Sequence, residues 1–174
     1  MPRLLPLALL GLVLAGCATE PPTLPSLAVT SSAFSQGKPI PKEFSCDGGD
    51  RSPPLSIAGL PAGADYVAVV LDDPDAPKGT WTHWTFWDLP AAKAGNLPAG
   101  VAVEGLGAIQ GTTSAGSVGY HGPCPPGGTH RYFVRAYATN GSLGLAKGAS
   151  VDAVHKALKA KAVAQGELMG TYSR

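Results

Sequence analysis

Hydrophobic residues fall in three long stretches that predict the strands of a sheet. Residues 65–71, DYVAVVL, are apolar at successive positions, which is typical of a strand buried on both faces. Residues 80–89, TWTHWTFWDL, and residues 130–139, HRYFVRAYAT, are rich in β-branched and aromatic side chains. Shorter candidate strands lie at residues 27–30, 55–57 and 101–104. With glycine and proline spread between them, these segments predict one turn-rich, mainly β domain.

One helix is predicted near the C-terminus. Ser150 can cap it, the apolar residues from Val151 to Leu158 follow helical spacing, and lysines gather at its end. Gly166 and Gly170 then interrupt the pattern. We therefore expect the chain to finish as a short tail after this helix.

Alternation along a strand assigns side chains to faces. In the second stretch it places four residues together: Trp81, His83, Thr85 and Trp87. In the third stretch His130, Tyr132 and Val134 share a face, and Arg131, Phe133 and Arg135 take the other. Each strand thus begins with a histidine and an aromatic residue on one side, whereas Trp84 and Phe86 are expected in the core.

The first residues form an export signal. Arg3 precedes an apolar run of about 11 residues, which is too short to span a bilayer. The run ends in Leu-Ala-Gly-Cys, which resembles a lipobox whose Cys17 is acylated after removal of residues 1–16. An ordinary secretory signal is the alternative. Residues 17–26 then form the lipidated N-terminus and a proline-rich tether, and residues 27–174 form the domain. Ala18, rather than aspartate after the cysteine, resembles lipoproteins of an outer membrane.

The balance of charges bears on the expected partners, and the cysteines bear on the expected chemistry. Without Arg3, 12 of the 13 basic side chains remain against 12 acidic ones, so nucleic acid, which requires a basic face, is not an expected partner. Cys46 and Cys124 form an even pair, which in an exported chain favours a disulfide. A free nucleophilic Cys124 near His130 is the alternative.

The loop at residues 71–79, LDDPDAPKG, carries Asp73 and Asp75 on either side of Pro74. Its prolines and its spacing do not fit a calcium loop, so no metal is expected there. A solvated acidic turn is the simplest interpretation. A functional site is the alternative, because Trp81 and His83 follow on the next strand.

Three segments together resemble the phosphatidylethanolamine-binding protein family, and most closely its bacterial, Raf kinase inhibitor-like branch. They are the SCDGGDRSPPL…DDPDAP segment, THWTFWDLP, and GYHGPCPPGGTHRYFVRAYA. The resemblance runs from about Phe34 to the C-terminus. It implies a β-sandwich of two antiparallel sheets with a short C-terminal helix and a small anion-binding pocket. The pocket residues implied by the resemblance are Asp73, Pro74, Asp75, Trp81, His83, Tyr120, Gly122, Cys124, Pro125, His130 and Tyr132.

Such a pocket contains no lysine or arginine, so its expected donors are histidines, tyrosine hydroxyls and loop N–H groups. Asp73 would repel an anion unless it is protonated or hydrogen-bonds His83 and holds it as imidazolium. The resemblance also makes the Asp73–Pro74 bond the candidate for a cis peptide. Tyr172 is not assigned the pocket-covering role of a tyrosine in eukaryotic relatives, and the pocket is expected to be more open.

The expected function is a non-enzymatic binding module for phosphate, a phosphomonoester or a phospholipid-headgroup-like ligand, tethered to the cell envelope. No cofactor is expected. A hydrolase that uses Asp73, His83 and His130 is one alternative, and a protease inhibitor or other protein-directed modulator is another; homodimerisation stays open. Arg131 is expected in a structural ion pair, and His121 and His155 are expected to face solvent.

Overall fold

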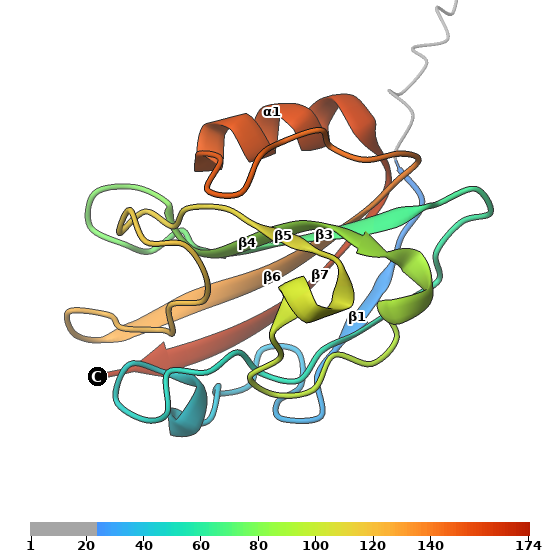
Figure 1. Cartoon of the computed structure of the whole chain (residues 1–174). Coiled ribbons are helices and arrows are strands. Elements are labelled where there is room, and N and C mark those ends of the chain that lie inside the picture. Colours follow the sequence, from blue (N-terminus) through green and yellow to red (C-terminus); the bar gives the residue numbers. More distant parts are fainter. Residues whose placement is uncertain (1–23) are drawn as a thin grey trace, which may run out of the picture.

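A five-stranded sheet forms the centre of the domain in the computed structural model, which describes residues 24–174 (Figure 1). Its strands follow the order β5-β4-β3-β6-β7, and all neighbours are antiparallel. Two further strands, β1 and β2, form a second antiparallel sheet. The elements are β1 (Ala28–Thr30), η1 (Lys42–Phe44), β2 (Ser56–Ala58), β3 (Tyr66–Asp73), β4 (Trp81–Pro90), η2 (Ala91–Lys93), η3 (Val103–Leu106), β5 (Ile109–Gln110), β6 (Thr129–Thr139), α1 (Val151–Lys161) and β7 (Ala162–Ser173). The predicted mainly β fold of two antiparallel sheets and one short helix is confirmed.

Strand β3 is buried on both faces, as its sequence predicts. Val67, Val69 and Leu71 point into the larger hydrophobic core, which lies between the five-stranded sheet and the smaller sheet. Ala68 and Val70 point into a smaller core under α1. The central sheet is therefore covered by α1 on one face and by β1, β2 and long loops on the other (Figure 1).

Helix α1 begins and ends close to the predicted positions. The Ser150 side chain accepts a hydrogen bond from the N–H of Ala153 at 3.2 Å, which caps the N-terminus. Lys159 and Lys161 lie in the last turn, where positive charge is favourable. The helix is held in place by Val154 and Leu158, which are buried against the sheet.

The expected short tail after α1 is wrong, because the chain continues directly into the 12-residue strand β7. Its glycines are sites of close packing and not breaks. A Cβ on Gly166 would lie 2.1 Å from the carbonyl oxygen of Leu27, and one on Gly170 would lie 2.6 Å from Ile40. These glycines let the N-terminal segments pack against the edge of β7.

The predicted face assignment holds for β6 but is wrong for the second half of β4. In β6, Tyr132 and Val134 lie in the larger core, on the opposite side from Arg131 and Arg135. In β4, Leu71 pairs with Trp84 and Asp72 pairs with Thr82, so His83 is an extra residue in a β-bulge. The bulge reverses the alternation. Trp84 and Phe86 pack in the larger core as expected, whereas Trp87 turns to the α1 side, away from His83.

Two smaller expectations are also corrected. Residues 101–104 form no strand; Val103–Leu106 is a short 3₁₀ helix. The Asp73–Pro74 bond is trans, as are all peptide bonds of residues 24–174. Within the same residues, no helix has the length and apolar character needed to cross a membrane. The export signal and Cys17 lie outside the described residues.

Candidate functional site

Three neighbouring strands bring the candidate functional residues to one edge of the sheet. Asp73 ends β3, while Trp81 and His83 begin β4 and His130 begins β6. Because β3 is antiparallel to both β4 and β6, its end lies beside the starts of the other two. Residues distant in the sequence therefore converge at this edge.

A cavity of about 280 Å³ opens at this edge. Its walls are Asp73, Ala76, Pro77, Trp81, His83, His121, Cys124, Pro125, Pro126 and His130. Apolar rings form most of the wall, while one carboxylate and three imidazoles supply the polar groups. Such a combination is typical of small-ligand sites, where a few polar groups orient the ligand. No group of three or more potential metal ligands gathers within residues 24–174.

The buried Asp73 carboxylate holds His130 in a defined orientation. Nδ1 of His130 lies 2.7 Å from Oδ2 of Asp73. The N–H of Asp75 donates to Oδ1 of the same carboxylate at 2.8 Å. Asp73 thus accepts from two donors, one on each carboxylate oxygen. Because His130 donates from Nδ1, its Nε2 is the ring nitrogen left for a ligand.

His83 is oriented in the same way, but by a backbone group. Its Nδ1 lies 2.9 Å from the carbonyl oxygen of His121, so Nδ1 carries the proton and Nε2 is left for the cavity. Burial lowers the pKa of the His83 imidazole, although the His121 carbonyl and the charge of Asp73 act in the opposite direction. His83 is therefore neutral at neutral pH. Of the two alternatives given for Asp73, the hydrogen bond to His83 is wrong, since Asp73 bonds His130 instead.

Asp75 is engaged by Arg131 and does not line the cavity. The guanidinium donates to both carboxylate oxygens, at 2.7 and 2.9 Å, and the Arg131 backbone N–H donates to one of them. These hydrogen bonds lower the pKa of Asp75 to about 2. The expectation that Arg131 forms a structural ion pair is confirmed.

The glycine- and proline-rich loop is fixed to the rest of the domain by a disulfide. Cys46 and Cys124, which are 78 positions apart in the chain, are bonded with their Cα atoms 5.5 Å apart. Two loop N–H groups are already used: that of His121 donates to the His83 carbonyl, and that of Gly122 donates to Asp50. The Tyr120 hydroxyl donates to the Phe44 carbonyl oxygen at 2.6 Å. These bonds shape the wall of the cavity and occupy donors that the sequence suggested for a ligand.

Six of the eleven predicted ligand-binding residues line the cavity: Asp73, Trp81, His83, Cys124, Pro125 and His130. Pro74 and Asp75 lie in the adjacent turn, and Tyr120 and Gly122 lie in the loop beside the cavity, with their polar groups bound elsewhere. Tyr132 lies beneath, where its ring meets the edge of His83 with centroids 5.3 Å apart.

His121 is the functional candidate that sequence reasoning missed. It was expected to face solvent, but it lines the cavity, its ring stacks on His83 at 6.0 Å, and its carbonyl orients His83. Its Nδ1 also lies 3.7 Å from Asp50. Its position directly beside the GPCPP segment was the available signal. His155, by contrast, is exposed on α1, as expected.

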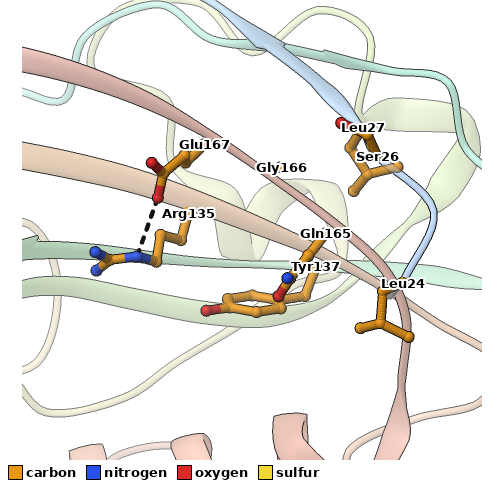
Figure 2. Close-up of a pocket in the computed structure, with 8 residues that line it drawn as sticks. All are labelled: Leu24, Ser26, Leu27, Arg135, Tyr137, Gln165, Gly166 and Glu167. Carbon is orange, nitrogen blue, oxygen red and sulfur yellow. Dashed lines mark ion pairs between the residues drawn. The ribbon is translucent and has the colours of Figure 1, made fainter. Parts of the chain in front are cut away.

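A larger hollow of about 450 Å³ lies elsewhere, where the described chain begins (Figure 2). Arg135 is the only cationic residue in its wall, and it is already paired with Glu167 at 3.4 Å and with Asp72 at 2.9 Å. Tyr137 and Gln165 lie beside it (Figure 2). Its lining holds no set of converging titratable groups like that around His83 and His130, so the smaller cavity is the better candidate site.

Comparisons with known proteins agree with this architecture. The family profile described as phosphatidylethanolamine-binding protein matches residues 30–173. A UPF0098 protein of Methanothermobacter thermautotrophicus is 42% identical over 146 residues, which cover 82% of this chain and 95% of that protein. A UPF0098 protein of Pyrococcus horikoshii is 38% identical over 183 residues, covering 100% of this chain and 91% of its own.

Solved structures give the same result. A phosphatidylethanolamine-binding protein homologue from Chlamydia trachomatis has a TM-score of 0.80 and 38% identity, covering 86% of this chain and 98% of its own. Escherichia coli YbcL, described as a new member of the mammalian family, has a TM-score of 0.78 and 30% identity. The match covers 86% of this chain and 99% of YbcL. The chain belongs to the phosphatidylethanolamine-binding protein family.

Proposed function

We propose that this protein is a non-enzymatic binding module that holds a small anion in the cavity at the end of β3, β4 and β6. The ligand class is phosphate, a phosphomonoester or a phospholipid-headgroup-like group. One observation carries the proposal: both His83 and His130 use Nδ1 for a protein acceptor, which leaves both Nε2 atoms for a ligand. Two oriented imidazoles on one wall suit an oxyanion.

Protonation is part of the proposed binding step. A neutral imidazole that donates from Nδ1 has only a lone pair at Nε2, so it cannot donate to a phosphate oxygen. When His83 takes up a proton, Nε2 becomes a charged donor, and charge-assisted hydrogen bonds are the stronger kind. The Asp73 carboxylate accepts from Nδ1 of His130 and so fixes the orientation of that ring. Anion binding and proton uptake are therefore linked.

The two carboxylates favour the phosphate part of a ligand over an ammonium part. Both oxygens of Asp73 already accept hydrogen bonds, and Asp75 is paired with Arg131. A phosphoethanolamine headgroup would thus find its ammonium partners occupied. The phosphate is the group that the site is best arranged to recognise.

The lining also supports binding over hydrolysis. Asp73 and His130 resemble a general base and its orienting carboxylate. However, the residues lining the cavity include no serine, threonine or lysine, and Cys124 is held in the disulfide. The pair therefore has no hydroxyl, amine or free thiol side chain to activate among the residues that line the cavity.

Calorimetry with inorganic phosphate at pH 6 tests the proposal. We expect His83→Gln to weaken binding by about tenfold to a hundredfold, the worth of one hydrogen bond to a charged group. The matched control is His155→Gln, which removes an exposed imidazole from α1 and should leave the affinity unchanged. Equal affinities of the wild type and both variants would contradict the proposed site.

We further propose that Cys17 is acylated and that the tether holds the domain at the cell envelope, at an outer membrane if the cell has one. The Leu-Ala-Gly-Cys segment at the end of the apolar run supports this location. The intact mass of the mature chain tests it. Acylation adds the mass of the lipid to a chain that begins at Cys17, whereas an ordinary signal leaves no such addition.

A further inference from the structure

We propose that the exposed lysines of α1 form a contact surface for anionic lipid headgroups. The α1 lysine face is defined here as Lys156, Lys159 and Lys161. Helix α1 lies on the opposite side of the central sheet from the larger core (Figure 1), and none of the three lysines lines the anion cavity. The inference goes beyond anion binding in the cavity but rests on the proposed acylation of Cys17.

The orientation of α1 presents these lysines outward. Val154 and Leu158 are buried toward the sheet, whereas all three lysines are exposed. The helix contains only one carboxylate, Asp152, in its first turn. None of the three lysines forms an ion pair within residues 24–174, although Lys161 donates to the Ser142 carbonyl oxygen. Positive charge therefore accumulates in the second half of the helix.

The start of the described chain lies against the same end of α1. Leu24 lines a hollow of about 420 Å³ together with His155, Leu158 and Lys159. Seven residues connect Cys17 to Leu24, and fully extended they reach at most about 25 Å. An 11-residue helix is about 16 Å long. An acylated Cys17 would thus keep the whole lysine face within reach of the bilayer surface.

The anchor makes a weak attraction sufficient. Each lysine close to an anionic membrane surface favours the bound state by about fivefold. Once a lipid holds the chain, contact between α1 and the bilayer becomes intramolecular, so its effective concentration is high. A basic patch beside one lipid anchor is a known way to stabilise membrane attachment. Leu24, which is 39% exposed, adds an apolar contact at the edge of this face.

This orientation has a consequence for the cavity. The tether joins β7 at Gln165, opposite Tyr137, whereas His130 lies opposite Tyr172 at the other end of the same strand pair. Seven residues of strand separate Gln165 from Tyr172, which is about 23 Å. The cavity therefore lies at the opposite end of this strand pair from the residue at which the tether joins the domain.

Lysine reactivity on vesicles tests the inference. The mature acylated chain is placed in neutral phosphatidylcholine vesicles or in vesicles that also contain phosphatidylglycerol, and a brief pulse of an amine-acylating reagent is followed by peptide mass spectrometry. We expect the α1 lysines to react at least about fivefold more slowly on the anionic vesicles at low salt. Lys38, Lys42 and Lys93, which are exposed on the side of the larger core, should react equally on both.

Variants separate the lysine face from total charge. In K156Q/K159Q/K161Q, His155 remains as a reporter on α1, and its carbethoxylation should no longer be slowed by anionic vesicles. The matched control K38Q/K42Q/K93Q removes the same charge, including Lys93, which donates to the Leu106 carbonyl as Lys161 does to Ser142. In this control variant, anionic vesicles should still slow the carbethoxylation of His155.

Three results would overturn the inference. One is equal reactivity of the α1 lysines on neutral and anionic vesicles to which the chain is attached. Another is that anionic vesicles fail to slow the carbethoxylation of His155 in both triple variants alike. The third is failure of the chain to float with neutral vesicles, which would remove the anchor itself. Phosphate calorimetry on the same preparation reports the cavity separately, so these outcomes are distinct from failure of the anion site.

Discussion

Nδ1 of His130 lies 2.7 Å from Oδ2 of Asp73, and the pair is buried at the end of the central strands. The carboxylate determines which imidazole nitrogen carries the proton and directs the other nitrogen to the cavity. The His121 carbonyl does the same for His83 at 2.9 Å. The cavity wall holds one carboxylate and three imidazoles, and protonation of His83 changes its charge, so its affinity for anions should depend on pH.

Anion affinity is expected to increase as pH falls from 8 to 5.5. Burial lowers the pKa of His83 in the free protein, and a bound anion raises it, so binding takes up a proton. Linkage then requires tighter binding at lower pH. Sulfate is the best probe for calorimetry because it remains a dianion throughout this range, whereas phosphate titrates.

His83→Gln should flatten this pH dependence as well as weaken binding. His155→Gln should show the wild-type profile, because its imidazole is exposed on α1. Sulfate affinity that rises with pH, or does not change, would contradict proton-linked binding.

The ion pair between Asp75 and Arg131 predicts a loss of stability in acid. Arg131 lowers the pKa of Asp75 to about 2, below the ordinary value of 3.8. The contribution to the free energy of unfolding is thus complete above pH 3.8 and is lost as pH falls toward 2. Asp75→Asn should lower the urea midpoint modestly at pH 7, since exposed pairs contribute little.

The difference between Asp75→Asn and the wild type should then shrink as pH falls toward 2 and disappear below it. Asp65→Asn removes an exposed carboxylate for which no ion pair is found within residues 24–174, and it should have little effect at either pH. A difference for Asp75→Asn that persists unchanged at pH 2 would refute the role of its charge.

Much of the fold could be predicted because local signals agree with the final structure. The continuous apolar run of β3 and the Ser150 cap of α1 needed no tertiary information. The strand β7 could not be predicted, since Gly166 and Gly170 interrupt its pattern. Glycine is needed at these two positions because Leu27 and Ile40 approach the β7 backbone closely, which only the folded chain shows.

The candidate site shows a similar division. The family resemblance implied Asp73, His83 and His130, and strand alternation added that a histidine and an aromatic residue share a face at the start of each of two strands. The sequence could not show that Asp73 bonds His130 and not His83, because the bulge at His83 changes the register of β4. Nor could it show that Gly122 donates its N–H to Asp50. Hydrogen-bond partners distant in the sequence decide which groups a ligand can still use.

Removal of the disulfide should destabilise the domain and open the cavity. The bond between Cys46 and Cys124 spans 78 residues, and the chain-entropy model gives about 4–5 kcal/mol for such a loop as an upper value. The double variant Cys46→Ala/Cys124→Ala should lower the free energy of unfolding by up to this amount. It should also weaken phosphate binding, since Cys124 lines the cavity.

A reductant provides the control for this prediction. Dithiothreitol should lower the urea midpoint of the wild type and leave that of the double variant unchanged. Thiol titration of the native, unreduced protein should find no reactive thiol at either cysteine. Two reactive thiols there would contradict the bond.

Two tyrosines beside the cavity, Tyr132 buried and Tyr120 half-buried, should respond differently to loss of the hydroxyl. The Tyr120 hydroxyl donates to the Phe44 carbonyl at 2.6 Å, whereas the Tyr132 hydroxyl is buried close to Asp73 but meets no partner with hydrogen-bond geometry within residues 24–174. Tyr120→Phe should therefore cost about 1–3 kcal/mol, because a buried carbonyl loses its donor. Tyr132→Phe should leave the free energy of unfolding unchanged or raise it, because it removes an unpaired polar atom.

Urea unfolding of the two variants measures this contrast, and each variant is the control for the other, since both delete one oxygen. Equal destabilisation would show that the Tyr132 hydroxyl has a partner, such as an ordered water. Phosphate calorimetry on Tyr132→Phe then tests the ligand role expected from the sequence. Burial and the charge of Asp73 raise the pKa of Tyr132, so its hydroxyl stays protonated and can only donate to an anion. A weaker phosphate affinity without loss of stability would assign that donor to the ligand.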